Sequence, residues 1–296
     1  MVSSRPLFRF QLAAHLNGRM LDGFPPNPTN CERDMSSQSS KTAFSGTAND
    51  YASYRPPYPN AFLAHLRTAA GSTGQGLLLD LACGPGRIAI PMASYFRHVV
   101  AVDLEPEMIS VAQQRANQLG RRNIEWRVTP AEQLQLAPAS VELITIGEAF
   151  HRLEQNHILE LASEWLGQNG HLATLGGEAI WSGPEPWKRI VVAVANRWAN
   201  IALPEPTAAP WGEPFEIFRA TGWQVTQYQM RVATIWTADS IIGFMRSTSF
   251  ASANALGGKV AQFETDLRQK LLAFGPQDRF PADQRFGYTL ARKSSV

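Results

Sequence analysis

Two acidic residues and two glycines occur where predicted strands end, in a spacing that could bind a nucleoside-type ligand. Asp80 ends the apolar run Leu77-Leu78-Leu79 and is followed by the turn Leu81-Ala82-Cys83-Gly84-Pro85-Gly86-Arg87. Asp103 ends the next β-branched run. Glycines let a backbone approach a ligand closely, and a helix N-terminus after the turn favours a carboxylate or phosphate. An acid at position 103 could accept hydrogen bonds from a ribose diol, so the pattern predicts a site at the carboxyl edge of a sheet.

The glycine pattern alone fits two ligand classes. Gly84 to Ala89 also matches the looser dinucleotide fingerprint G-x-G-x-x-G/A, with Asp103 about 20 residues further on. Asp80 favours the other class, because a carboxylate before the turn would repel a pyrophosphate but could bind an amino group. Asp103 could instead only cap a helix. Cys83 is interpreted as a small buried residue, since no base is spaced to activate it.

A mostly parallel α/β sheet is needed to position these residues. Short apolar runs, each followed by a helical pattern or crossover, predict strands at 77–80, 98–103, 124–128, 141–146 and 171–175. Helices are expected at about 87–96, after Pro106 as first helical residue, and around 190–198. Beyond residue 181, the pattern predicts that further strands complete the sheet and that helices inserted between them form a cover. The strands are expected from the alternation over 223–236 and from the run at 286–291, and the helices after a Thr237 cap and at 260–274.

Composition excludes several other protein classes. The 296 residues include 27 Lys+Arg and 25 Asp+Glu, a balance that offers no broad basic surface for nucleic acid. Apolar residues make up 44%, which excludes disorder for the bulk of the chain. No run approaches the ~18 apolar residues of a membrane span. Two cysteines suggest neither a disulfide framework nor a metal site. We expect a soluble, cytoplasmic globular protein.

The first 34 residues differ from the rest. They are rich in Arg and Pro and carry no acid before Asp22. We expect an N-terminal extension outside the core, with Met35 as the functional start and a mitochondrial presequence as the alternative. Its removal is expected to leave activity intact.

In their order along the chain, these motifs resemble the class I S-adenosylmethionine-dependent methyltransferases, particularly the small-molecule branch similar to trans-aconitate methyltransferase. The resemblance spans roughly residues 42–292 and rests on the stretches 79–87, 99–103, 128–132, 141–151 and 166–172, with 44–58 upstream and 243–249 and 286–290 downstream. It implies an α/β, Rossmann-like, mostly parallel seven-stranded sheet with helices on both faces and an added helical cover. Residues 35–296 would form one domain, comprising a lid (42–60), a cofactor-binding half (77–176) and a substrate-side half (177–296).

The resemblance implies S-adenosylmethionine as cofactor. Its contacts would come from Arg55, Asp80, Ala82, Gly84, Gly86, Asp103, Leu104, Ala131, Glu132 and Gly147. Among these, Asp80 and the glycines would hold the methionine end, Asp103 the ribose, and Leu104 with Ala131-Glu132 the adenine. Ala82 replaces the usual first glycine, and an alanine is tolerated at this position only if its φ is negative. Pro130 replaces an acid that often bonds the adenine amine, and Glu142 replaces an Asp with no expected consequence.

The expected reaction is in-line displacement at the sulfonium methyl by a small organic acceptor, without a metal. His151 is the leading candidate base and Glu148 the second, although His151 could instead only orient its loop. Tyr51, Phe150 and Trp181 are the candidate substrate contacts. The rivals are an NAD(P)-dependent oxidoreductase and a cofactor-binding protein that does not transfer methyl. The partner expected is a small-molecule substrate, not nucleic acid or membrane; the acceptor atom and oligomeric state stay open.

Overall fold

In the computed structural model, which describes residues 44, 46–206 and 216–293, seven strands form one sheet of order β3-β2-β1-β4-β5-β7-β6. Strands β1 to β5 run parallel, whereas β7 is antiparallel to both β5 and β6. The strands are β1 (Leu77–Leu81), β2 (His98–Asp103), β3 (Ile124–Val128), β4 (Val141–Gly147), β5 (Leu166–Gly177), β6 (Trp223–Trp236) and β7 (Phe280–Lys293). The predicted Rossmann-like sheet is therefore confirmed.

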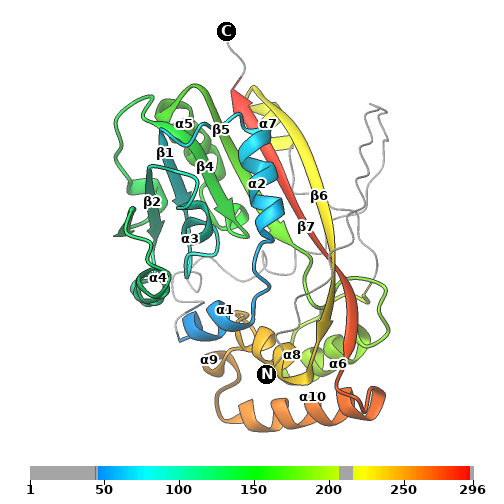
Figure 1. The fold of residues 1–296 in the computed structure, drawn as a ribbon. Coiled ribbons are helices and arrows are strands. Elements are labelled where there is room, and N and C mark those ends of the chain that lie inside the picture. Colours follow the sequence, from blue (N-terminus) through cyan, green and yellow to red (C-terminus); the bar gives the residue numbers. More distant parts are fainter. Residues whose placement is uncertain (1–43, 45, 207–215, 294–296) are drawn as a thin grey trace, which may run out of the picture.

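Helices cover both faces of the sheet, as predicted (Figure 1). Helices α2 (Asn60–Ala69), α3 (Ala89–Met92) and α4 (Pro106–Gln118) lie on one face, and α5 (Gln155–Trp165) and α7 (Glu216–Ala220) on the other. Two separate apolar clusters follow, one including Phe62 and Met92 and the other Ile158 and Phe218. Pro106 begins α4, as expected for a residue that needs no N–H at that position.

The helix expected at 87–96 is only the four-residue α3, flanked by turns. Pro91 lies within it and has no N–H to bond the carbonyl of Arg87, so the hydrogen-bond ladder is interrupted there. In the part of the chain that the structure describes, the short 3-10 helices are η3 (Ala131–Gln133), η4 (Phe150–Arg152) and η5 (Gly257–Lys259).

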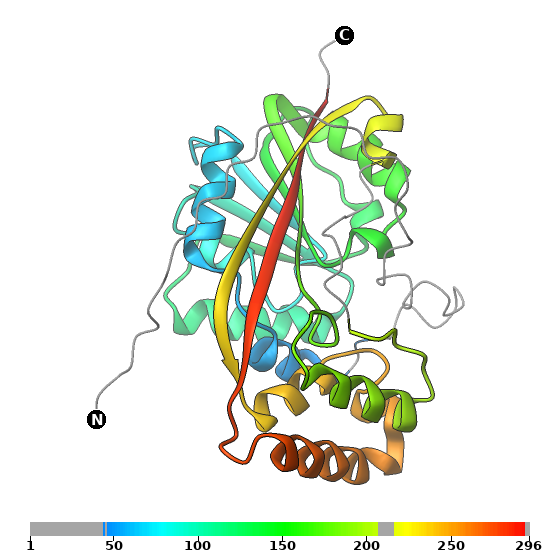
Figure 2. The ribbon, with the colours of Figure 1, turned by 90° about the vertical axis from the view of Figure 1, so that its right-hand side faces the viewer.

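The long strands β6 and β7 extend from the sheet into the helical cover, as Figure 2 shows. They pair along their whole length, from Trp223 opposite Lys293 to Trp236 opposite Phe280. The final strand therefore begins six residues earlier than the sequence pattern predicted. The cover consists of α6 (Lys188–Ala199), α8 (Ala238–Arg246), α9 (Ala253–Leu256) and α10 (Val260–Phe274), which share a third apolar cluster. Thr237 caps α8 in a capping box with Ser240, as predicted.

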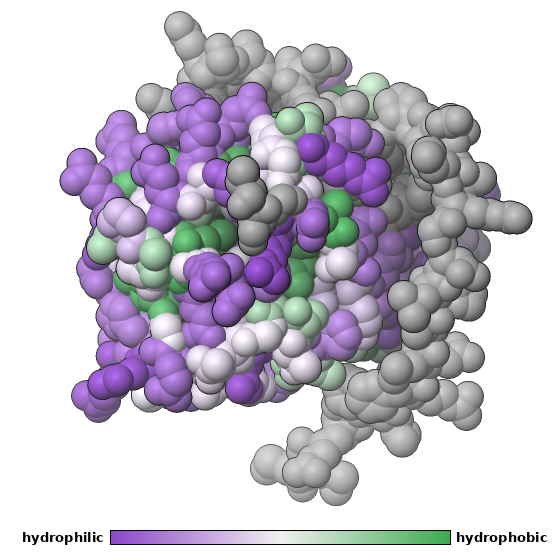
Figure 3. Space-filling view, turned by 90° about the horizontal axis from the view of Figure 1, so that it is seen from above, coloured by the Kyte–Doolittle hydropathy of each residue, from purple (hydrophilic) through white to green (hydrophobic). Residues whose placement is uncertain are grey.

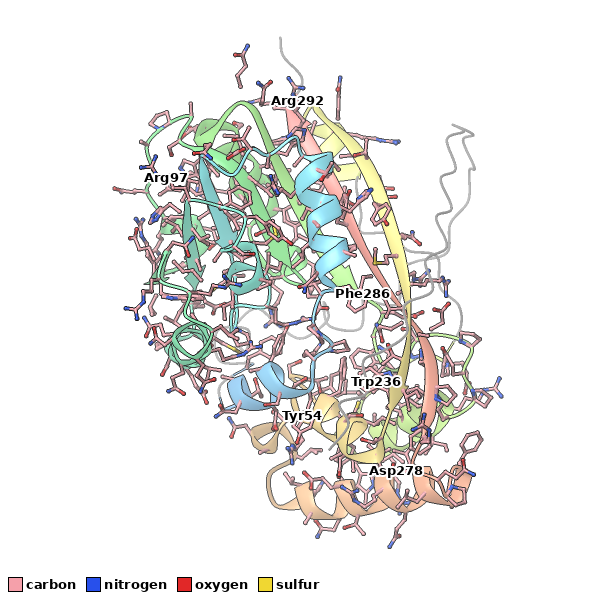
Figure 4. The ribbon with its side chains drawn as sticks, in the orientation of Figure 1. Tyr54, Arg97, Trp236, Asp278, Phe286 and Arg292 are labelled. Atoms are coloured by element: carbon pink, nitrogen blue, oxygen red, sulfur yellow. The ribbon has the colours of Figure 1, made fainter. Side chains whose placement is uncertain are left out.

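Helix α1 (Ala48–Tyr54) lies between the carboxyl edge of the parallel strands and the cover (Figure 1). It is held on both sides. Asp50 forms a two-armed ion pair with Arg246 of α8, and the N–H of Gly46 donates to Glu107 of α4. Tyr54 packs directly over Gly243 of α8, at the boundary visible in Figure 4. The segment 42–60, predicted as a lid and called the lid below, contains, where described, α1 and the approach to α2; its function as a lid stays a prediction.

The amino-terminal edge of the parallel strands lies at the opposite end of the sheet. There, hydrophilic side chains predominate around small hydrophobic patches (Figure 3). No helix within the described residues is long and apolar enough to cross a membrane. The predictions for residues 1–34 lie outside the described residues, and the single domain from residue 35 stays a prediction.

Candidate functional site

The turn after β1 has a backbone that leaves open space for a ligand. Gly84 and Gly86 both adopt positive φ, +53° and +76°. A Cβ on Gly84 would meet nothing within 4 Å, whereas one on Gly86 would lie 2.7 Å from Ile90 and 3.1 Å from Trp126. Gly86 is therefore favoured by its positive φ and by the side chains packed beside it, while Gly84 presents bare backbone to open space. This separates the structural glycine from the one a ligand can approach.

Ala82 differs from the sequence expectation, because its φ is +50° and not negative. For a residue with a Cβ, this left-handed conformation costs about 1–2 kcal/mol. The conformation persists because neighbouring hydrogen bonds hold the turn: the Cys83 N–H donates to Val102 O and the Gly86 N–H donates to Cys83 O. The turn therefore keeps its geometry at a cost that a glycine would avoid.

We predict that Ala82→Gly raises the free energy of unfolding by about 0.5–1 kcal/mol, since it removes this strain despite the greater chain entropy of glycine. Urea titration of both proteins measures the change. Ala93→Gly is the control, because Ala93 has φ −58° and so carries no such strain; this variant is expected to lose stability. A loss of stability in Ala82→Gly as well would contradict the prediction.

Asp80 connects the turn to the neighbouring strand and helix. Its side chain is fully buried, and its two oxygens accept hydrogen bonds from the Ala89 N–H at 2.9 Å and the Thr145 hydroxyl at 2.8 Å. Burial raises the pKa of this carboxyl to about 7, although both hydrogen bonds act to lower it. Each oxygen keeps acceptor capacity, so Asp80 can hold the turn and still accept from an amino group.

Asp103 ties the end of β2 to the same turn. Its carboxylate accepts from the N–H of Gly84 at 2.7 Å and from the N–H of Glu105 at 2.9 Å. The side chain is thereby fixed in position, with lone pairs left for further donors. Leu104, next to it, is 42% exposed, unusually bare for a large apolar side chain. An anchored carboxylate beside a bare apolar surface suits a ribose carrying a flat base.

A small cavity lies behind the turn, between β1, β4 and the lid. Its lining is formed by Tyr51, Tyr58, Asp80, Ala82, Cys83, Gly84, Arg87, Ile88 and Gly147. The hydroxyl of Tyr58 is buried and has no hydrogen-bond partner among the described residues. A Cβ on Gly147 would lie 2.7 Å from Ile88 and 3.4 Å from that hydroxyl. Burial and the nearby Glu148 raise the pKa of Tyr58, so its phenol stays a proton donor. The Tyr58 hydroxyl, a buried donor without a partner beside an unfilled cavity, fits the polar methionine end of the implied cofactor.

Glu148 joins the lid to the turn through a buried charge cluster. One of its oxygens lies 3.0 Å from Nη1 of Arg87 and 3.5 Å from Nη1 of Arg55, and it accepts from the Tyr51 hydroxyl at 3.2 Å. Burial acts to raise the pKa of Glu148, but the two guanidinium groups outweigh it and lower the pKa. A carboxylate held ionised in this way is a poor proton acceptor near neutral pH, which weakens its candidacy as a base.

The other predicted site residues are only partly brought together. Tyr51 and Arg55 meet at the lid, with Arg55 also donating to the Ser247 hydroxyl at 2.8 Å. Trp181 packs edge-on against Phe244 of α8, whose ring lies 4.4 Å from the guanidinium of Arg55. Trp181 is therefore separated from the charge cluster of Arg55, Arg87 and Glu148 by the ring of Phe244.

Phe150 is buried, stacks on Phe218 of α7 at 5.1 Å and is not among the residues that line the cavity. Its role as a substrate contact stays a prediction. His151 follows it in η4 and is not among the residues that line the cavity. Ala131 and Glu132 form η3 beyond β3, where Glu132 accepts from the Glu154 N–H at 3.2 Å. They remain candidate adenine contacts.

Sequence reasoning did not assign roles to Arg87, Tyr58 or Glu142. A cation at the start of the helix predicted at 87–96 would oppose the helix dipole, and this was the available signal for Arg87. Glu142, expected to have no consequence, accepts hydrogen bonds from three backbone N–H groups, those of Thr73, Gly74 and Gly76. Its longer side chain thus organises the loop that precedes β1.

Comparisons with known proteins give similarity to methyltransferases. Residues 78–170 match the family model described as a methyltransferase domain. A ubiquinone/menaquinone biosynthesis C-methyltransferase of Rubrivivax gelatinosus is 44% identical over 81 residues, 27% of this chain and 30% of that protein. A methyltransferase of Aspergillus candidus is 27% identical over 165 residues, 51% of each chain. A solved structure from Anaeromyxobacter dehalogenans, provisionally assigned as a type II methyltransferase, has TM-score 0.56 at 21% identity over 81% of this chain and 98% of that one.

The structure is an α/β sheet with a glycine turn and two anchored carboxylates, Asp80 and Asp103, at its carboxyl edge. The methyltransferase-domain match over residues 78–170, together with the Rossmann-like fold, supports a class I S-adenosylmethionine-dependent methyltransferase domain in this part of the chain. The chain spans about half the length, or less, of the two curated relatives. Their substrates therefore carry over only as a proposal.

Proposed function

We propose that this protein transfers a methyl group from S-adenosylmethionine to a small organic acceptor by in-line displacement. When bound, the cofactor supplies an electrophilic methyl group on a sulfonium centre. The observation that carries the proposal is the Asp103 carboxylate, anchored by the N–H groups of Gly84 and Glu105 beside the exposed Leu104. Tyr58 and Asp80, in the cavity next to it, offer a donor and an acceptor for a zwitterionic methionine end.

The acceptor is proposed to bind under the lid, toward the helical cover. Tyr51 and Trp181 come from elements that border this region, and Arg55 connects them through Glu148 and Phe244. The Tyr51–Glu148–Arg87 contacts connect α1 to the wall of the small cavity. If the acceptor is a hydroxyl or phenol, His151 is the proposed base; a carboxylate or thiolate needs none.

Calorimetry with Asp103→Asn tests the cofactor assignment. The variant keeps the side-chain shape but offers one carbonyl oxygen where two N–H groups and a ribose need acceptors. We expect the wild type to bind S-adenosylhomocysteine and not NADH or NADPH, and the variant to lose about tenfold or more in affinity. Asp283→Asn, at an exposed ion pair with Arg231, is the control and should bind as the wild type does. Binding of NADH instead of S-adenosylhomocysteine would overturn the proposal.

Methyl transfer itself is tested separately, with labelled S-adenosylmethionine against small acids, phenols and amines. Label recovered in one of these classes is the expected result and identifies the acceptor chemistry. Binding of the cofactor without methyl transfer to any of these classes would favour the alternative function, in which the protein binds the cofactor and does not methylate.

A further inference from the structure

A second and larger pocket lies on the outer side of the glycine turn. Its volume is about 470 Å³, and it is bounded by the segment from the end of α1 to the start of α2, by α3 and its flanking turns, and by the end of α4. Four arginines line it: Arg55, Arg87, Arg115 and Arg121. No Asp or Glu is among the described residues that line it. We call this the arginine pocket.

The positive charge of the arginine pocket is poorly compensated within the described residues. Arg55 and Arg87 share one carboxylate, that of Glu148. Arg115 donates from Nη1 to the carbonyl of Pro85 at 2.7 Å, which supplies no counter-charge. Nε of Arg121 is buried and has no hydrogen-bond partner in the part of the chain that the structure describes. Burial and the neighbouring Arg87 lower the pKa of Arg115, as expected where cations face each other.

Four clustered guanidinium groups that share a single carboxylate are costly for a protein alone, but they match an anionic ligand. Each guanidinium can form two parallel hydrogen bonds with a carboxylate or phosphate. The volume lies in the range of small-molecule sites. The rings of Tyr58 and Tyr95 complete the walls, with Tyr58 4.7 Å from the guanidinium of Arg87. These features favour a small ligand with more than one negative group.

We propose that the arginine pocket is a binding site for a small polyanion that carries carboxylate or phosphate groups. The pocket is distinct from the cofactor cavity, because Arg115 and Arg121 line only the former, while Tyr58 and Arg87 form the wall between the two. The proposal does not depend on methyl transfer, since the same charges and walls are present whatever the neighbouring cavity binds.

Calorimetric titration of the full chain with citrate and with inorganic pyrophosphate tests this proposal. We expect saturable binding of at least one probe, beyond the effect of sodium chloride at equal ionic strength; the probe that binds distinguishes carboxylate from phosphate. The double variant Arg115→Gln/Arg121→Gln should weaken binding at least tenfold. Arg122→Gln is the matched control, because Arg122 is exposed, adjacent in sequence and not in the lining, and it should change affinity less than twofold.

Two further measurements keep the outcome clear. Circular dichroism and thermal unfolding establish that each variant is folded; if the double variant is not, Arg121→Gln alone replaces it, since the Nε of Arg121 has no partner to lose. Asp103→Asn and saturating S-adenosylhomocysteine should both leave probe binding intact. The proposal is overturned if neither probe binds beyond the salt effect, if the arginine variants bind as the wild type does, or if S-adenosylhomocysteine blocks the probe.

Discussion

Glu148→Gln is expected to lower the free energy of unfolding by about 3 kcal/mol or more, because removal of one partner leaves buried charges uncompensated. The side chains of Arg87 and Arg55 are only 8% and 12% exposed, and both depend on this carboxylate. Glutamine has nearly the same shape, so the loss comes from charge and not from a cavity. Urea titration at pH 7 measures the difference.

The pH dependence gives this prediction a second readout. The pKa of Glu148 is lower in the folded protein than its ordinary value, since Arg87 and Arg55 outweigh burial. Its contribution to stability is therefore present above the ordinary pKa of glutamate and is lost as the pH falls through the lowered value. The difference between wild type and Glu148→Gln should shrink in acid.

The matched control is Glu205→Gln, which removes the same charge from an ion pair with Arg189 whose side chains are 78% and 72% exposed. We expect that variant to change stability by less than about 1 kcal/mol. Equal effects in the two variants would show that the buried cluster contributes no more than a surface pair.

Gly243→Ala is expected to cost about 1–3 kcal/mol and to loosen the lid, because the new methyl group has no space. An ideal Cβ on Gly243 would lie 2.2 Å from the nearest atom of the Tyr54 ring. Either the ring of Tyr54 or the whole of α1 must shift away from α8. Amide hydrogen exchange should then be faster in residues 48–54, alongside the loss of stability in urea.

A double-mutant cycle with Tyr54→Ala isolates the cause. In the Tyr54→Ala background the clash is gone, so Gly243→Ala should cost much less there than in the wild type. Gly258→Ala serves as control, since its added Cβ meets nothing within 4 Å and its φ lies outside the strained positive range. Additive effects at positions 54 and 243 would contradict the steric explanation.

Local sequence patterns predicted the elements that hold the site. The apolar runs of β1 to β4, the Pro106 start of α4 and the Thr237 cap are set by neighbours within a few residues. Their order was enough to predict that Asp80, Gly84 and Asp103 lie together at the carboxyl edge of the sheet. The length of β7 was underestimated, because its first residues pair with β6 beyond the part of the strand that packs on β5.

Side-chain direction and backbone strain were decided by the tertiary structure. Ala82 has positive φ because contacts from β2 hold the turn, which no property of alanine indicates. Phe150 faces the core and not the cavity, because α7 offers it Phe218 to stack on. The arginine pocket joins side chains from positions 55 to 121, separated along the chain and brought together only when α1, α3 and α4 pack. By itself the sequence determined which residues lie at the edge of the sheet; the packing of distant elements decided where their side chains point.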